Sequence, residues 1–141
     1  MSTSQIWEHF EHEADIGVRG FGSTLEQAYC SAAQGLIEVI SPIENIVAEK
    51  PINIHCKAPD HELLLVDWLN ALIYEIAVHR MLFSRFEVTI NDRELEATAW
   101  GESIDLEKHS PSVEVKGATY TELKVEQQDN GTWLAQCIVD V

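Results

Sequence analysis

The strongest constraint on the fold is a segment, residues 60–79, that is apolar on nearly every side of a predicted helix. Its core positions recur at helical spacing: Leu65, Trp68, Leu69, Leu72, Ile73 and Ile76. Leu63, Leu64 and Val66 widen this stripe, whereas Asp67 is expected on the solvent side. Asp60 is a suitable N-cap for the helix. A helix this apolar must be covered by other elements on more than one side.

A second helix is predicted from the capping signal at residue 23 up to residue 40. Ser23 and Glu26 have the spacing of a capping box, in which the hydroxyl and the carboxylate satisfy free N–H groups. The apolar positions that follow recur at helical spacing: Leu25, Ala28, Tyr29, Ala32, Ala33, Leu36, Ile37 and Ile40. The helix is expected to end at Ser41, because the residue before Pro42 avoids the α region.

The rest of the chain has the pattern of strands and tight turns. The segments predicted as strands are residues 52–56, 86–90, 95–99, 113–125 and 133–140. Asn91-Asp92 and Asn130-Gly131 predict the turns that join them. The order of elements predicts an α+β fold, with one domain over residues 1–141 and the two main helices packed against a mixed or antiparallel β-sheet.

The charge balance limits the class of partner. Nine basic and 24 acidic residues give a net charge of −15. A chain this acidic is not drawn to a phosphate backbone, so strong direct binding of nucleic acid is not expected. A basic protein partner or bound cations fit the charge better, and solubility alone is the alternative explanation.

The location is predicted from the cysteines and the absence of targeting patterns. No stretch approaches the ~20 apolar residues of a membrane span, and the first residues lack a signal-peptide pattern. The three scattered cysteines, Cys30, Cys56 and Cys137, indicate reduced and buried thiols. These features predict a cytoplasmic protein that does not associate with membranes.

Acidic residues near both ends of the chain are the first candidate site. If Val141 is the natural end, its carboxylate is adjacent to the side chain of Asp140, and the two anions repel unless a cation lies between them. Asp15, in the sequence His12-Glu13-Ala14-Asp15, would bring a third carboxylate, and such a set suits calcium or magnesium. The alternatives are a solvated strand end at Asp140 and an ordinary polar turn at residues 12–15.

Two further polar features stand out, and both have ordinary structural explanations. Lys116 lies among apolar neighbours on a predicted strand, where it is either a surface charge or a group that reaches an anion. Residues 100–109 are predicted to form a polar loop. No P-loop, GxGxxG, HExxH or GxSxG motif is present, and no cysteine has a clear histidine partner. These absences argue against an independent enzyme.

Taken in order, several segments resemble those of the archease family. They are residues 12–17 (HEADIG), Gly22 with residues 24–28, Leu64-Leu65, Trp68-Leu69-Asn70, Gly101-Glu102, His109, Val115-Lys116, Ala118-Thr119-Tyr120 and residues 138–141. The resemblance spans essentially the whole chain and is carried by the order and spacing of these segments. Archeases are accessory proteins of the RtcB-type RNA ligase, which joins RNA ends in tRNA splicing and RNA repair with GTP and a metal. The resemblance implies that this chain promotes guanylylation and repeated turnover of such a ligase and is not itself an enzyme.

The resemblance also implies a ligand set. Family members hold a divalent cation through the aspartate of the first motif, the penultimate aspartate and the terminal carboxylate, which fall on Asp15, Asp140 and Val141. Calcium is the first expectation, with magnesium or manganese as the other choices. The family lysine falls on Lys116, and His12 and Glu13 flank the site as residues for activation or partner contact.

Three positions depart from the family pattern. Residue 13 is Glu in place of the usual Thr and adds a negative charge beside the site. Residue 121 is Thr where many members have His, and residue 141 is Val where Ile is frequent. The last change is not expected to matter, because the ligand would be the main-chain carboxylate.

Two other function classes remain open from the sequence. A small stand-alone metal-dependent hydrolase would need a base beside the metal, and His12 is the only obvious one near the acids. A chaperone-like adaptor for RNA-processing proteins is the other, although direct RNA binding is disfavoured by the charge.

Overall fold

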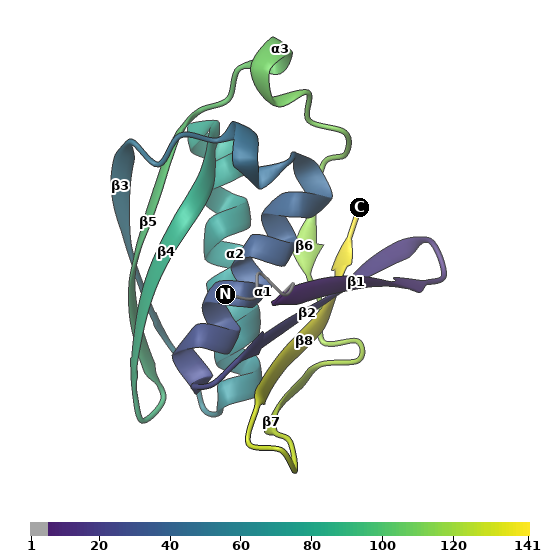
Figure 1. Cartoon of the computed structure of the whole chain (residues 1–141), viewed down its shortest axis with the longest axis vertical. Helices are drawn as coiled ribbons and strands as arrows, with labels where there is room; N and C mark the ends of the chain where they lie inside the picture. Colours follow the sequence, from purple (N-terminus) through teal and green to yellow (C-terminus); the bar gives the residue numbers. More distant parts are fainter. Residues whose placement is uncertain (1–5) are drawn as a thin grey trace.

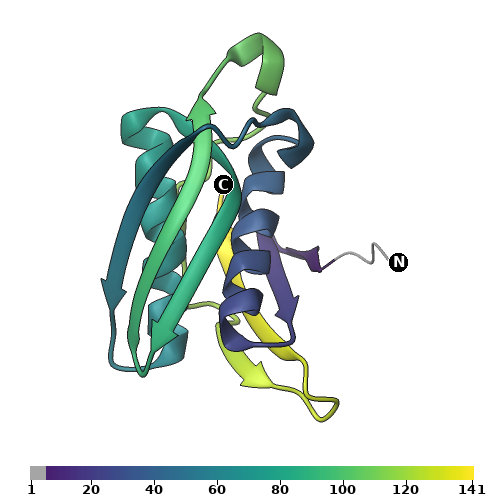
Figure 2. The ribbon, with the colours of Figure 1, turned by 60° about the vertical axis from the view of Figure 1, so that its left-hand side comes forward.

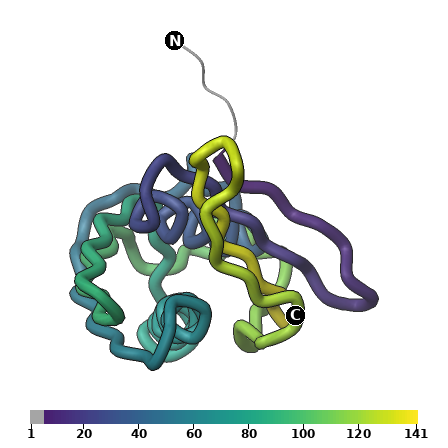
Figure 3. Tube along the Cα trace, turned by 90° about the horizontal axis from the view of Figure 1, so that it is seen from below, coloured from purple at the N-terminus to yellow at the C-terminus, as the bar shows by residue number. Residues whose placement is uncertain are grey.

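Two long helices lie between two β-sheets in the computed structural model, which describes residues 6–141 (Figures 1 and 3). The helical elements are α1 (Leu25–Ile40), η1 (Ile43–Asn45), α2 (His61–His79) and α3 (Leu106–His109). The strands are β1 (Trp7–His12), β2 (Asp15–Gly22), β3 (Lys50–Lys57), β4 (Met81–Asn91), β5 (Glu94–Ser103), β6 (Gly117–Ala118), β7 (Lys124–Gln127) and β8 (Trp133–Asp140). The α+β class is confirmed.

Both sheets are antiparallel. The first has the order β1-β2-β8-β6, and β7 also pairs with β8. The second has the order β3-β5-β4, and Figure 2 looks onto it with α2 behind it and α1 to its right. The predicted mixed or antiparallel sheet is therefore two separate antiparallel sheets, one on each side of the helices.

Helix α1 begins one residue later than its capping signal predicts. Thr24 is the N-cap, and its hydroxyl oxygen accepts the Gln27 N–H at 3.1 Å. The side chain that reaches back is that of Gln27, which accepts from the Ser23 N–H at 3.1 Å, so the prediction of Ser23 as cap was wrong. The predicted end at Ser41 is confirmed, because Ser41 is the C-cap.

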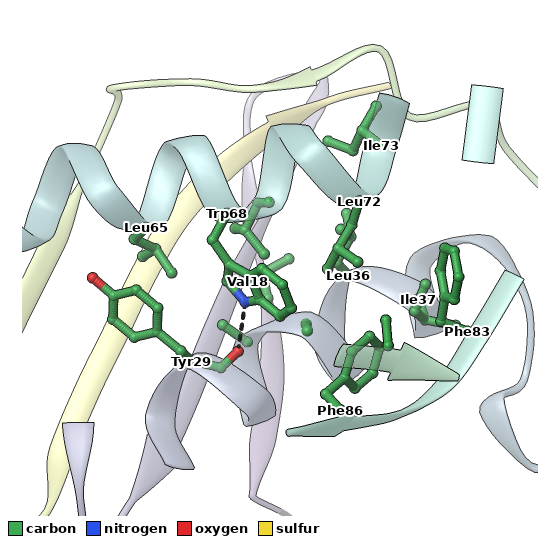
Figure 4. Packing of buried hydrophobic residues seen from close by; sticks show 14 of the residues in the cluster. Val18, Tyr29, Leu36, Ile37, Leu65, Trp68, Leu72, Ile73, Phe83 and Phe86 are labelled. Carbon is green, nitrogen blue, oxygen red and sulfur yellow. Dashed lines mark hydrogen bonds between the residues drawn. The ribbon is translucent and has the colours of Figure 1, made fainter. Parts of the chain in front are cut away.

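Helix α2 begins and ends as predicted and is covered on several sides. Asp60 is its N-cap and accepts the Leu63 N–H at 2.8 Å. Strands of both sheets contact the helix, and Trp68 is fully buried with its indole N–H donated to the Tyr29 carbonyl at 3.1 Å (Figure 4). Asp67 is exposed, as expected. The apolar character of α2 is thus explained by its place between the sheets.

The segment at 113–125 is much less regular than predicted. Only Gly117–Ala118 and Lys124–Gln127 form strands there, and both pair with β8. The predicted turns are confirmed: Asp92 has a φ of 59° in the β4–β5 turn, and Gly131 has a φ of 89° before β8. Within the described residues, no helix is long and apolar enough to cross a membrane.

Candidate metal centre

The His12–Asp15 motif forms a hairpin with a two-residue turn. His12 and Asp15 are paired as the last residue of β1 and the first of β2, and Glu13 and Ala14 form the turn. Glu13 has a φ of 54°, which an L-residue adopts at some cost in conformational energy. The turn therefore fixes Asp15 at the end of the sheet, in line with the end of β8.

The pairing of β2 with β8 brings Asp15 to the last two residues. Ile16 pairs with Val139, so the next step of the same register brings Asp15 opposite Asp140. Opposite residues of an antiparallel pair project from the same face of the sheet. The Asp15 carboxylate also accepts the Val141 N–H at 3.3 Å. The structure thus brings together, from distant parts of the chain, the three residues proposed as metal ligands.

Strand β6 borders the same chain end on the other side, and Figure 1 shows the C-terminus between β6 and the β1–β2 hairpin. Gly117 pairs with Asp140, and the Lys116 N–H donates to the Asp140 carbonyl at 2.8 Å. The Lys116 side chain is exposed. A cationic side chain therefore lies one strand away from the acidic pair.

The donor set fits a hard divalent cation only if the main-chain carboxylate takes part. Asp15 is half-buried and Asp140 is exposed, and both offer oxygen, the donor that calcium and magnesium prefer. Among residues 6–141, no group of three or more His, Cys, Asp and Glu side chains is placed to hold a metal. The Val141 carboxylate would supply the third anion.

His12 and Glu13 lie next to this arrangement and, in the described part of the chain, form no such three-residue cluster with it. His12 Nδ1 is 3.8 Å from Glu13 Oε2, and the Glu13 side chain is 87% exposed. For both residues, a role in activation or partner contact stays a prediction.

The segment predicted as a polar loop contains a buried histidine. His109 is fully buried, and its Nδ1 accepts the Asp105 N–H at 2.9 Å. Its Nε2 then carries the proton and donates to Glu102 at 3.0 Å. The Ser41 hydroxyl donates to the His109 carbonyl at 2.7 Å, which joins the end of α1 to α3.

Glu102 is the centre of this network. It accepts from Lys108 Nζ at 2.7 Å and from the Val47 N–H at 2.8 Å, in addition to His109. The Lys108 ammonium, the Val47 N–H and the His109 N–H together lower the pKa of the Glu102 carboxyl to about 2. In the sequence, Gly101-Glu102 and His109 stand out as separate motifs. Nothing in the sequence pattern indicates that Glu102 and His109 are hydrogen-bonded to each other.

The cysteines have the character of structural residues, although only one is as buried as expected. All three are free thiols, and Cys137 is buried while Cys30 and Cys56 are half-buried. Burial raises the pKa of Cys30 and Cys56 to about 11 and that of Cys137 to about 12. Thiols with such pKa values are poor nucleophiles at neutral pH.

Comparison with known proteins gives a consistent result. The Archease protein family (MTH1598/TM1083) matches residues 7–141. Protein archease of Pyrococcus furiosus is 40% identical over 139 residues, which cover 96% of this chain and 98% of that protein. None of these names states a catalytic activity.

Two solved structures share the fold. The solution structure of Methanobacterium thermoautotrophicum protein 1598 has a TM-score of 0.85 and 31% identity, and the match covers 98% of this chain and 100% of that one. The crystal structure of a Thermotoga maritima archease, described as a possible chaperone, has a TM-score of 0.63 and 21% identity, with 94% of both chains covered. The motifs, the fold and the relatives agree, and the chain belongs to the archease family.

Proposed function

We propose that this protein is a metal-binding accessory protein that activates an RtcB-type RNA ligase. In this role it promotes the GTP-dependent guanylylation of the ligase and its repeated turnover in tRNA splicing and RNA repair. The protein would act in the cytoplasm, without catalysing a reaction of its own and without binding RNA strongly.

The observation that carries the proposal is the hydrogen bond from the Val141 N–H to the Asp15 carboxylate at 3.3 Å. It ties the first motif to the last residues, although they are far apart in the chain. Asp15, Asp140 and the Val141 carboxylate would together hold calcium, magnesium or manganese. A bound cation would neutralise the repulsion among three carboxylates.

The partner is inferred from charge and from the family. A net charge of −15 favours association with a basic protein surface and disfavours a phosphate backbone. Lys116, His12 and Glu13 border the acidic pair and would contact the ligase there. A cation held at the edge of such an interface would either order the docking surface or be delivered to the partner.

The test is guanylylation of the purified cognate ligase with GTP and a divalent cation, with and without this protein. The native protein should raise both the rate of guanylylation and the number of turnovers. Asp15→Asn should lose most of this stimulation, because it removes one anionic ligand. Asp129→Asn is the matched control, since Asp129 is exposed in the β7–β8 turn and the change in charge is the same. A ligase whose guanylylation and turnover are the same with and without the native protein would refute the proposal.

A chaperone-like adaptor is distinguished by the same proteins. An adaptor of that kind would protect the ligase from aggregation without added cation, and the Asp15→Asn variant would protect it as well as the native protein does. A stimulation that needs both the cation and the Asp15 carboxylate supports activation through the metal site.

A further inference from the structure

The segment that carries Lys116 is held to β8 by a few hydrogen bonds. The Lys116 N–H donates to the Asp140 carbonyl at 2.8 Å, and the Thr119 N–H and hydroxyl donate to the Ile138 carbonyl at 3.0 and 2.9 Å. Regular pairing is limited to the two residues of β6. A ladder this short has little stability of its own.

The opposite side of β6 is held by one side chain of α2. The Asn70 Oδ1 accepts the Ala118 N–H at 2.8 Å, and the Asn70 Nδ2 donates to the Ala118 carbonyl at 3.4 Å. A carboxamide has one acceptor and donors on one planar group, so it can satisfy both main-chain groups of a single residue. Asn70 thereby takes the place that a neighbouring strand would have.

Asn70 lies on a helix whose position is fixed by the core, so its contact with Ala118 can restrain the β6 segment. Asn70 lies on the same helix as Trp68 and Leu69, which are fully buried, so its main chain is fixed by the core. Gly117, the residue between Lys116 and Ala118, has the greatest backbone freedom of any residue type. A Cβ added at Gly117 would meet only the Asn70 Oδ1, at 3.6 Å, among atoms within 4 Å. The fixed helix therefore restrains a segment whose other anchors are its hydrogen bonds to β8 and the buried side chain of Val115.

We propose that Asn70 is a positioning residue, which holds β6 against β8 and so keeps Lys116 beside the Asp140–Val141 chain end. The two hydrogen bonds to Ala118 are the means, and the segment moves away from β8 when they are lost. The functional part of this inference rests on the proposed role of Lys116 in ligase activation. The mechanical part rests on the geometry alone.

The mechanical part is tested by amide hydrogen exchange, measured residue by residue by NMR. Asn70→Ala removes both hydrogen bonds, and Asn70→Asp keeps the volume and the acceptor but turns the donor toward Ala118 into a second acceptor. In both variants we expect exchange at the Lys116 and Thr119 amides to rise about tenfold or more, because one or both of the restraining hydrogen bonds are lost. These two amides donate to β8 and not to Asn70, so they report the position of the whole segment.

The control is Asp67→Ala, at another exposed position of α2, which should leave exchange at both amides unchanged. Unchanged exchange at Lys116 and Thr119 in the Asn70 variants would overturn the inference, even if the Ala118 amide exchanges faster.

The functional part is tested by a double-mutant cycle on ligase stimulation at a temperature where every variant is fully folded. If Asn70 acts through Lys116, Asn70→Ala should reduce stimulation, and Asn70→Ala combined with Lys116→Ala should be no worse than Lys116→Ala alone. Stimulation by Asn70→Ala equal to that of the native protein, or losses that multiply in the double variant, would overturn it. Failure of the proposed function itself would be recognised separately, because the native protein would then give no stimulation.

Discussion

Asp15 has two neighbours, His12 and Val141, that are far apart in the sequence. On one side it closes the β1–β2 hairpin with His12, and on the other it accepts the Val141 N–H. A carboxylate in this position can bind a cation and also hold the end of β8 in register. Replacing Asp15 should therefore weaken metal binding and increase motion of the last residues.

Lys116 is the residue whose role is most easily separated from stability. Lys116→Ala should change the free energy of unfolding by no more than ~0.5 kcal/mol, because the side chain is exposed. Ligase stimulation should nevertheless fall, since a cationic group beside the acidic pair is lost. Lys124→Ala is the control, because Lys124 is also exposed on a strand that pairs with β8. Denaturant titration measures the effect on stability, and guanylylation of the ligase measures the effect on stimulation. Full stimulation by Lys116→Ala would show that the lysine has no role in activation.

At the scale of elements, α1 and β2 pack so closely at Gly20 that there is no room for a side chain at that position. A Cβ added at Gly20 would lie 2.2 Å from the Ala32 nitrogen and 2.5 Å from the Ala28 carbonyl oxygen. These are main-chain atoms of α1, so they cannot move aside as a flexible side chain does. The glycine in β2 and the alanines in α1 thus set the spacing between the helix and the five-stranded sheet.

Gly20→Ala should destabilise the protein by roughly 1–3 kcal/mol or more, through the overpacking of α1 against β2. Gly117→Ala is the control, because its added Cβ would meet only an ordinary contact with Asn70 at 3.6 Å. Urea denaturation compares the two variants with the native protein. An unchanged midpoint for Gly20→Ala would contradict the close packing of α1 on β2.

The α3 region should respond to acid through Glu102. The folded-state pKa of Glu102 is about 2, below the ordinary value of 4.5. The ionised carboxylate therefore stabilises the fold in full at a pH above 4.5. That contribution is lost as the pH falls from about 4.5 toward about 2. We expect the free energy of unfolding to fall less steeply over this range in Glu102→Gln than in the native protein. Lys108→Ala, which removes the largest cause of the shift, should give an intermediate slope. Identical slopes for all three proteins, measured by chemical denaturation at each pH, would show that Glu102 does not stabilise this region.

Sequence patterns predicted the elements that depend on local signals. The start of α2 at Asp60, the end of α1 at Ser41 and the turns at Asp92 and Gly131 follow from single residues with strong preferences. The burial of α2 on several sides follows from its composition. The separation of the strands into two sheets depends instead on how the helices pack, and no local pattern contains that information.

The candidate site was predictable only in part, for the same reason. Asp140 and Val141 stand out because their carboxylates are adjacent if the chain ends at Val141, and Asp15 stands out because it belongs to a cluster of His and acidic residues. Asn70 and His109 form their decisive hydrogen bonds with main-chain atoms, of Ala118 in one case and of Asp105 in the other. Main-chain partners leave no mark in the sequence, so these contacts appear only in the structure.

At the scale of the whole molecule, charge is the dominant property. The net charge of −15 makes the protein repel other acidic surfaces and attract basic ones over distances of about a Debye length. Such a field steers association and raises its rate more than it raises the strength of the final contacts. The acidic chain end at Asp140 and Val141 lies within this field.

Binding to the ligase should therefore weaken as salt rises. Raising sodium chloride from about 50 to about 500 mM shortens the Debye length from above roughly 10 Å to a few ångströms, and we expect the association rate to fall more than the dissociation rate rises. Surface plasmon resonance or stopped-flow fluorescence separates the two rates. An affinity that is the same at low and high salt would contradict an electrostatic docking surface.

The cation site is the central claim, and calorimetric titration with calcium, magnesium and manganese tests it most directly. The native protein is compared with Asp15→Asn, with Asp140→Asn, and with a form extended beyond Val141, in which the terminal carboxylate becomes a neutral amide. Asp129→Asn, an equal change in charge at a distant turn, is the control. We predict that the native protein and the control bind a divalent cation with the same affinity, and that each of the other three forms binds it at least about tenfold more weakly. We also predict that the cation raises the unfolding temperature of the native protein. Equal affinity in all five proteins, or no binding by the native one, would contradict the site.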